Sequence, residues 1–135
     1  LFQRKTISDY YFYKSLIFSR KTLKDDEYSL YKRVFEIIQQ QLIKPDIYVY
    51  LHVSADRLLE NIRMRGRDYE RDISKNYLDQ IQKSYFDFIK TYKEITFLVI
   101  DVNNLDFVNH QKDYFKIKNV ILEGRFDPGM NMIIL

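Results

Sequence analysis

Apolar side chains recur every three or four residues along most of this chain, and this spacing predicts α-helices. The predicted helices cover about 9–22, 25–42, 55–66, 74–93 and 109–122. The clearest is 25–42, whose apolar residues form a single stripe along one side of the helix. The stripe consists of Leu30, Tyr31, Val34, Ile37, Ile38 and Leu42. Acidic residues at 25–27 suit the positive end of that helix's dipole.

Two shorter segments are apolar at nearly every position, which is typical of strands that are covered on both faces in a parallel sheet. These segments are 46–53, directly after Pro45, and 96–100. Ser54 follows the first of them as the expected N-cap of the next helix, and that helix is expected to end near Gly66.

Strands that alternate with helices predict a parallel α/β sheet. The end of the chain after Gly124 contains the turn signal Asp127-Pro128-Gly129 and an apolar stretch, and no strand is predicted there. Two strands are too few to cover these helices, so the missing strands are expected on the N-terminal side. Position 1 is Leu rather than Met, which also indicates a processed or incomplete chain. We therefore interpret 1–135 as a single partial domain.

The composition narrows the class of protein without identifying it. A chain of 135 residues with 12 Tyr and 10 Phe has enough apolar area for one folded core. The net charge is +3 with acids and bases interspersed, so a nucleic-acid-binding module is not favoured. There is no Cys, and His52 and His110 lie too far apart to indicate a metal site. No apolar run is long enough to span a membrane and no signal peptide is recognisable, so a cytoplasmic protein is expected.

The most informative segment is 63–71, which carries four arginines within nine residues, at 63, 65, 67 and 71. It follows a predicted strand and helix, and Gly66 offers a hinge. Arginine binds phosphate oxygens through paired N–H groups and keeps its charge at neutral pH. A segment of this kind can close over a nucleotide and stabilise the charge on a phosphoryl group during its transfer. The alternative is a solvated helix end in which the arginines pair with Asp68, Glu70 and Asp72.

The order of several short motifs resembles that in the deoxynucleoside kinase family, which contains deoxycytidine, deoxyguanosine and deoxyadenosine kinases. The similar motifs are Ser8-Asp9-Tyr10-Tyr11, Pro45-Asp46-Ile47-Tyr48-Val49-Tyr50-Leu51, Arg65-Gly66-Arg67-Asp68-Tyr69-Glu70, Tyr77-Leu78 and Asp101-Val102-Asn103-Asn104-Leu105-Asp106-Phe107. In the family they correspond to a helix entry, a buried strand, an arginine-rich lid, a helix start and the loop that borders the donor adenine. The resemblance covers about 4–122. No single motif is specific, but their order and spacing agree.

The resemblance implies a P-loop kinase-like fold, a three-layer parallel sheet with helices on both faces. This chain would be its mostly helical C-terminal portion. The implied activity is ATP-dependent phosphorylation of a deoxynucleoside 5′-hydroxyl in nucleotide salvage, with Mg²⁺, by a cytoplasmic homodimer. The apolar stripes at 10–18 and 30–42 are compatible with a dimer interface, and the alternative is that they fill the core. Neither nucleic acid nor a membrane is an expected partner.

The resemblance also implies roles for residues of the lid, at about 63–72. Arg65 and Arg67 correspond to catalytic arginines that bind the ATP phosphates, and Arg63 is a further ATP-binding candidate. Glu70 corresponds to the acid that accepts a hydrogen bond from the 3′-hydroxyl of deoxyribose. A charged acceptor of this kind discriminates strongly in favour of hydroxylated sugars.

Other implied roles fall outside the lid. Asp106 and Phe107 correspond to residues of the ATP site, with Phe107 against the adenine. Asp9 corresponds to an acid that reads the substrate base, and Tyr13 to an aromatic ring that packs on that base. Arg4 corresponds to a catalytic arginine that faces the reacting phosphates. For Asp9 the alternative is a helix N-cap.

The sequence departs from the family pattern in several places. An acid-Arg-Ser triplet precedes the first helix in the family, and here only Arg4 matches it. A lid-helix arginine of the family falls on Asn61, and Tyr69 replaces one of two paired acids. No Gly-x-x-x-x-Gly-Lys-Ser/Thr occurs in the chain, so the phosphate-binding loop and the catalytic acid are expected upstream and the fragment alone is expected to be inactive. The alternatives are another nucleoside or nucleotide P-loop kinase, or a non-catalytic remnant that mediates association.

Overall fold

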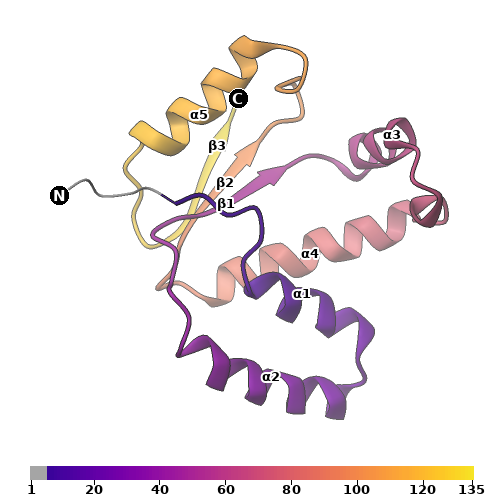
Figure 1. Cartoon of the computed structure of the whole chain (residues 1–135), viewed down its shortest axis with the longest axis vertical. Helices are drawn as coiled ribbons and strands as arrows, with labels where there is room; N and C mark the ends of the chain where they lie inside the picture. The colour runs from indigo at the N-terminus through magenta and orange to yellow at the C-terminus, as the bar shows by residue number, and fades with distance from the viewer. Residues whose placement is uncertain (1–5) are drawn as a thin grey trace. The chain divides into compact units, whose positions relative to one another are not determined.

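The computed structural model describes residues 6–135, which fall into two compact units, 6–44 and Pro45–Leu135. The first unit contains the helices α1 and α2, and the second contains a parallel sheet with its own helices (Figure 1). The boundary between the units lies at Pro45, which follows the second predicted helix.

The first unit is a pair of helices that pack through aromatic side chains. The helices cover Tyr13–Thr22 (α1) and Asp25–Gln39 (α2). Phe12 and Phe35 stack with their ring centroids 4.5 Å apart, and Tyr13 is buried beside Phe35. The hydroxyl of Tyr13 accepts a hydrogen bond from Nε2 of Gln39 at 2.9 Å, so this buried phenol has a polar partner.

Both helices of this unit are shorter than the apolar pattern predicts. α1 begins at Tyr13, with Phe12 as its N-cap, rather than at residue 9. Before it, the Ser8 hydroxyl donates to the carbonyl of Tyr10 at 2.6 Å, which stabilises a bend instead of a helical turn. α2 ends at Gln39, a few residues before the predicted end.

The apolar stripe of α2 is largely exposed. The buried residue of this helix is Phe35, whereas the stripe residues Leu30, Val34, Ile37 and Ile38 are 65%, 47%, 67% and 42% exposed. Within the unit formed by α1 and α2, the stripe is therefore not part of the buried core. In α1, by contrast, the apolar residues Leu16 and Ile17 are buried.

The second unit contains a three-stranded sheet in which every strand is parallel to its neighbour. The strands are Tyr48–His52 (β1), Thr96–Asp101 (β2) and Gly129–Ile134 (β3), in the order β1-β2-β3. Tyr50 lies beside Val99, and Val99 lies beside Met132. The predicted parallel α/β class is confirmed.

The third strand differs from the expectation for the end of the chain, where no strand is predicted. The N–H of Gly129 donates to the carbonyl of Ile95 at 2.9 Å, and the N–H of Leu135 donates to Asp101 at 3.2 Å. An apolar run of this length has no period of its own that separates a strand from an irregular end. It becomes a strand because the outer edge of β2 supplies hydrogen-bond partners for its backbone.

The central strand β2 is covered on both faces, and its residues Phe97, Leu98, Val99 and Ile100 are fully buried. Alternate side chains of a strand point to opposite faces, so consecutive residues meet different helices. Each side chain of this kind contributes about 1.5–3 kcal/mol to folding by its burial. β2 is therefore the core of the second unit.

Helices α4 (Lys75–Thr91) and α5 (Gln111–Glu123) lie on opposite faces of the sheet (Figure 1). Helix α3 (Ala55–Arg65) follows β1 and contacts α4, and a short 3₁₀ turn at Asp68–Glu70 (η1) lies between α3 and α4. The rings of Phe88 in α4 and Phe97 in β2 meet edge to face, with their centroids 5.9 Å apart. On the other face of the sheet, Ile117 of α5 packs with Leu98 and Ile100. Figure 1 shows α4 and α5 on opposite sides of the strands, as the three-layer prediction requires.

Burial also changes the chemistry of the aromatic face. Tyr50 of β1 stacks on Tyr85 of α4 with the ring centroids 4.9 Å apart, and burial raises the pKa of Tyr50 to about 12. This partly buried phenol therefore stays neutral to a higher pH than a free tyrosine does. None of the helices formed by the described residues is both long and apolar enough to cross a bilayer.

Candidate functional site

The carboxyl ends of β1 and β2 lie at the same edge of the sheet, because the strands are parallel. His52 and Asp101, the last residues of these strands, are register partners. Open parallel sheets bind ligands in the crevice outside this edge. The chain leaves β1 toward α3 and the lid, and it leaves β2 through the loop 102–110. The two segments that the sequence singles out thus start from the same edge.

Asn103 connects these two segments. Its Oδ1 accepts a hydrogen bond from the backbone N–H of Ser54 at 2.8 Å, and its Nδ2 donates to Oδ1 of Asp101 at 2.8 Å. Its backbone N–H donates to the same Asp101 oxygen at 3.0 Å. Asn103 is not among the predicted site residues, although an Asp-x-Asn that directly follows a predicted strand is a recognisable signal for such a turn.

The lid helix α3 has its ends where the sequence predicts them. The Ser54 hydroxyl accepts from the N–H of Arg57 at 3.3 Å and caps the N-terminus. Gly66 closes the C-terminus with a φ of 67°, in the left-handed region that glycine adopts without strain. At the start of the helix, Asp56 binds Lys75 of α4 at 2.7 Å, so the bases of the two helices flanking the lid are tied together.

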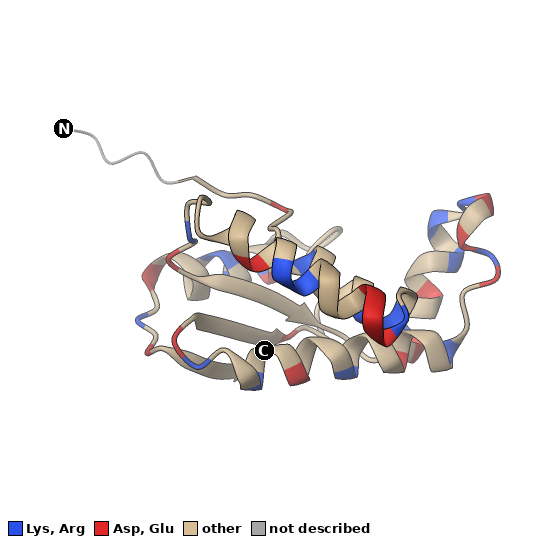
Figure 2. Cartoon of the chain, turned by 90° about the horizontal axis from the view of Figure 1, so that it is seen from below, with Lys and Arg blue, Asp and Glu red and all other residues tan. Residues whose placement is uncertain are grey.

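The two lid arginines on either side of Gly66 converge on one carboxylate. Arg65 Nη2 lies 3.1 Å from Oε2 of Glu70, and Arg67 Nη1 lies 3.6 Å from its Oε1. Arg67 Nη1 also donates to the hydroxyl of Tyr69 at 3.0 Å. Figure 2 shows blue and red bands close together at this end of α3. The predicted salt bridges to Glu70 and Asp68 are therefore present, whereas Asp72 forms no ion pair with the described residues; phosphate binding by the arginines stays a prediction.

Glu70 is the most enclosed member of this group, with 11% of its side chain exposed, against 47% for Arg65 and 50% for Arg67. Its Oε2 is buried and, although it lies within ion-pair distance of Arg65, it accepts no hydrogen bond of good geometry from the described residues. A carboxylate oxygen has more than one lone pair to offer. Oε2 is thus an enclosed oxygen without a hydrogen-bond donor among the described residues, and a ligand hydroxyl would reach it only after the side chains around it move.

The remaining lid arginines differ from this pair. Arg71 pairs with Asp68, and both are largely exposed. Arg63 is exposed on the last turn of α3 and has no ion pair among the described residues. Arg63, Arg65 and Arg67 thus lie along one helix end with charge available for an anionic ligand, which suits phosphate oxygens.

The loop after β2 holds its predicted site residues in structural contacts. Asp106 accepts hydrogen bonds from the side chain and the backbone N–H of Asn109, which lower the pKa of its carboxyl. Asp113 accepts from Lys116, which lowers its pKa in the same way, and it also accepts from the backbone N–H of Asp106. The role of Asp106 in an ATP site stays a prediction.

Phe107 is partly buried and packs against the core cluster around Leu98 and Ile100. This places its ring next to α5, on the face of the sheet that α5 covers. A contact between Phe107 and the adenine of ATP stays a prediction.

The other predicted site residues belong to the first unit. Asp9 is exposed in the segment before α1 and makes no hydrogen bond or ion pair with the described residues. It is not the N-cap of α1, which is Phe12. Tyr13 is 1% exposed in the core of its unit. Arg4 lies outside the described residues.

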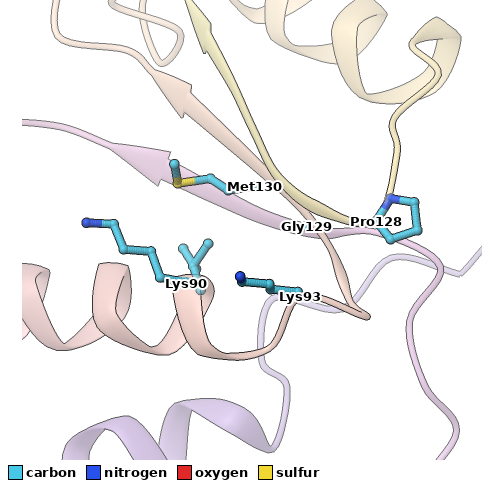
Figure 3. Close-up of a pocket in the computed structure, with 6 residues that line it drawn as sticks. Lys90, Lys93, Pro128, Gly129 and Met130 are labelled. Atoms are coloured by element: carbon cyan, nitrogen blue, oxygen red, sulfur yellow. The ribbon is translucent and has the colours of Figure 1, made fainter.

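A shallow cavity of about 320 Å³ lies at the opposite edge of the sheet, where β3 begins (Figure 3). It is lined by Ile89, Lys90, Lys93, Pro128, Gly129 and Met130. This cavity is distant from the carboxyl ends of the strands, so it is separate from the lid. Within 6–135, no group of three or more His, Asp or Glu residues is arranged to hold a metal ion.

A parallel α/β sheet whose first strand and helix lead into an arginine-rich segment offers a cationic surface that suits phosphate oxygens. Comparison with known families specifies the class of protein, because the profile of the family "Deoxynucleoside kinase" matches residues 1–124. The chain belongs to the deoxynucleoside kinase family. β3 lies outside the matched residues.

Individual relatives agree with this family. The chain is 34% identical to a deoxyguanosine kinase of Bacillus subtilis over 82% of its own length and 56% of the relative's. It is 28% identical to a deoxyadenosine kinase of Dictyostelium discoideum (96% and 52%) and 25% identical to the deoxycytidine kinase of Rattus norvegicus (82% and 47%). The chain thus spans about half the length of the curated relatives it matches. No solved structure gives a significant match.

Proposed function

We propose that the complete protein transfers the γ-phosphoryl group of ATP to the 5′-hydroxyl of a deoxynucleoside. Membership of the family supports the reaction class, and relatives named as deoxyguanosine and deoxyadenosine kinases support the class of substrate. The observation that carries the proposal is the lid, in which two half-exposed arginines flank Gly66 and share the enclosed carboxylate of Glu70.

The arginines provide the electrostatic part of this chemistry. Phosphoryl transfer spreads negative charge over the oxygens of the moving group, and fixed cations lower the energy of that state. Arg65 and Arg67 are about half exposed, so their guanidinium groups are accessible to phosphate oxygens. Glu70 would accept the hydrogen bond of the sugar 3′-hydroxyl and orient the deoxynucleoside.

We assign the phosphate-binding loop and the ligands of Mg²⁺ to a part of the protein outside these residues. The sequence of the chain contains no Gly-x-x-x-x-Gly-Lys-Ser/Thr. When bound with ATP, Mg²⁺ would neutralise charge on the phosphates. The 135-residue chain by itself is therefore expected to transfer no phosphoryl group.

The test uses the protein produced from the complete reading frame. It is assayed with ATP against deoxyadenosine, deoxyguanosine and deoxycytidine, and in parallel against the corresponding monophosphates. Arg67→Ala is expected to lower kcat on the order of 10²-fold, as the loss of a transition-state charge partner does. The matched control is Arg71→Ala, which removes the same charge from the same segment without touching Glu70.

Three outcomes contradict the proposal. Activity on monophosphates alone would indicate a nucleotide kinase instead. Absence of activity on every substrate would favour a non-catalytic protein. Equal activity of Arg67→Ala and wild type would remove the lid arginines from the catalytic site.

We also infer that the complete protein forms a homodimer through α2. The exposed stripe around Leu30, Val34 and Ile37 supports this, since large apolar patches on helices are typical of subunit interfaces. Sedimentation velocity is expected to show a dimer for the wild type and a monomer for Ile37→Glu. Lys32→Glu, on the opposite side of the helix, is expected to remain dimeric, and a dimeric Ile37→Glu would contradict the assignment.

A further inference from the structure

Glu70 is a nearly enclosed carboxylate, and its charge needs compensation where it lies. An ionised carboxylate that loses most of its water is stabilised by nearby cations or by hydrogen bonds. With 11% of its side chain exposed, Glu70 has Arg65 at 3.1 Å on one oxygen and Arg67 at 3.6 Å on the other. The two guanidinium groups thus provide the compensation from two sides.

These contacts hold the carboxylate in place without using all its acceptor capacity. The shorter contact, from Arg65, lacks hydrogen-bond geometry, and Oε2 is left with an unused lone pair. Arg67 is itself held by the hydroxyl of Tyr69 at 3.0 Å. The side chains of Arg65, Arg67 and Tyr69 therefore limit where the Glu70 carboxylate can lie.

We propose that Arg65 and Arg67 are positioning residues for the sugar-binding carboxylate of Glu70, in addition to being phosphate-binding residues. The side of the lid that binds phosphate and the side that binds the sugar are then one charge-coupled unit. This inference rests on the proposed function, because it takes the ligand of Glu70 to be the 3′-hydroxyl of a deoxynucleoside. Its consequence is that an arginine change affects deoxynucleoside binding even when ATP is absent.

The coupling is measured between the Arg65 side chain and the 3′-hydroxyl of the ligand. The protein from the complete reading frame is titrated, without ATP, with a deoxynucleoside substrate and with the 2′,3′-dideoxynucleoside of the same base. The wild type is expected to bind the deoxynucleoside roughly 10- to 100-fold more tightly, as a hydrogen bond to a charged acceptor provides. In Arg65→Ala this ratio is expected to fall to about 3-fold or less, because the acceptor is no longer fixed.

Two further variants separate positioning from a general loss of positive charge or of folding. Arg71→Ala removes a charge from the same segment but has Asp68 as its partner, so it is expected to keep the wild-type ratio. Arg65→Lys keeps the charge but loses the planar fork, and an intermediate ratio is expected. Circular dichroism establishes that each variant is folded.

The outcomes distinguish this inference from the proposed function. If the wild type binds no deoxynucleoside, the proposed function fails. If it binds deoxynucleosides but does not distinguish the 3′-hydroxyl, or if Arg65→Ala keeps the full ratio, the positioning role is wrong while the kinase assignment stands. An equal loss in Arg71→Ala would attribute the effect to the overall charge of the lid and would also overturn the inference.

Discussion

Replacing Asn103 with alanine tests the polar connection between the lid helix and the loop after β2. The substitution removes two side-chain hydrogen bonds of 2.8 Å, one from the Ser54 N–H and one to the Asp101 carboxylate. The backbone hydrogen bond from residue 103 to Asp101, at 3.0 Å, is retained. Each lost bond contributes about 0.5–1.5 kcal/mol net, and water at the exposed Ser54 restores part of the loss. We expect the free energy of unfolding to fall by about 1–2 kcal/mol.

The assay is urea denaturation at pH 7, with Asn104→Ala as the matched control. Asn104 is exposed and makes no hydrogen bond with the described residues, so its replacement is expected to change stability by less than about 0.5 kcal/mol. Hydrogen exchange adds a local readout, because the Ser54 amide is expected to lose protection in Asn103→Ala. Equal stability of the two variants, with Ser54 protection unchanged, would refute the reasoning.

Asn103→Asp tests the same hydrogen bond by placing a second negative charge beside Asp101. The Nδ2 donor is replaced by a carboxylate oxygen that faces Asp101, where Nδ2 was 2.8 Å from Oδ1. Two carboxylates at this distance raise the pKa of one of them, so at pH 7 the variant is expected to be less stable than Asn103→Ala. The difference from wild type should narrow as the pH falls through this raised pKa, which lies above the ordinary Asp value of about 4, because a protonated carboxyl can donate again. A pH-independent difference would contradict this explanation.

Three further changes probe other parts of the fold. Gly124→Ala adds a methyl group that collides with the ring of Phe126 and the backbone carbonyl of Val120, and a loss of about 1–3 kcal/mol is expected by urea denaturation; a neutral result would mean that both the ring and the end of α5 have room to move. Gly66→Ala forces a φ of 67° on a residue with a Cβ, and about 1–2 kcal/mol of local stability should be lost, visible as faster amide exchange at the end of α3. In acid, the lowered pKa values of Asp106 and Asp113 mean that the folded state binds fewer protons than the unfolded state. The stability that these two carboxylates contribute is complete above a pH of about 4 and is lost as the pH falls below that value. In the double variant Asp106→Asn, Asp113→Asn, the free energy of unfolding should therefore depend less on pH in acid. An unchanged pH dependence would disprove the assignment.

The parts of the fold that sequence predicted well are those with local causes. α3 is capped by Ser54 and closed by Gly66, and both signals act within a few residues of the chain. The strands β1 and β2 were recognisable because a strand buried on both faces must be apolar throughout. The arginine-rich segment was recognisable for the same kind of reason, since four cations in nine residues stand out without any knowledge of the fold.

Features that depend on distant partners were not accessible in this way. β3 exists because the edge of β2 offers hydrogen bonds, which a short apolar run does not reveal. The apolar stripe of α2 predicted the helix correctly, but periodicity alone does not distinguish a buried face from an exposed one. A motif likewise singled out Asp9 and Tyr13, but it could not predict that Asp9 is exposed and Tyr13 is buried, because burial depends on distant residues.

For the lid, sequence determined which charges are present and where the helix that carries them ends. Only the tertiary structure decided that Arg65 and Arg67 meet on one enclosed carboxylate, that Tyr69 binds Arg67, and that Oε2 of Glu70 is enclosed without a hydrogen-bond donor among the described residues. The physical reason is that charge and capping are properties of neighbouring residues. The enclosure of Glu70 and the convergence of two guanidinium groups depend on how the chain turns after Gly66 and packs there.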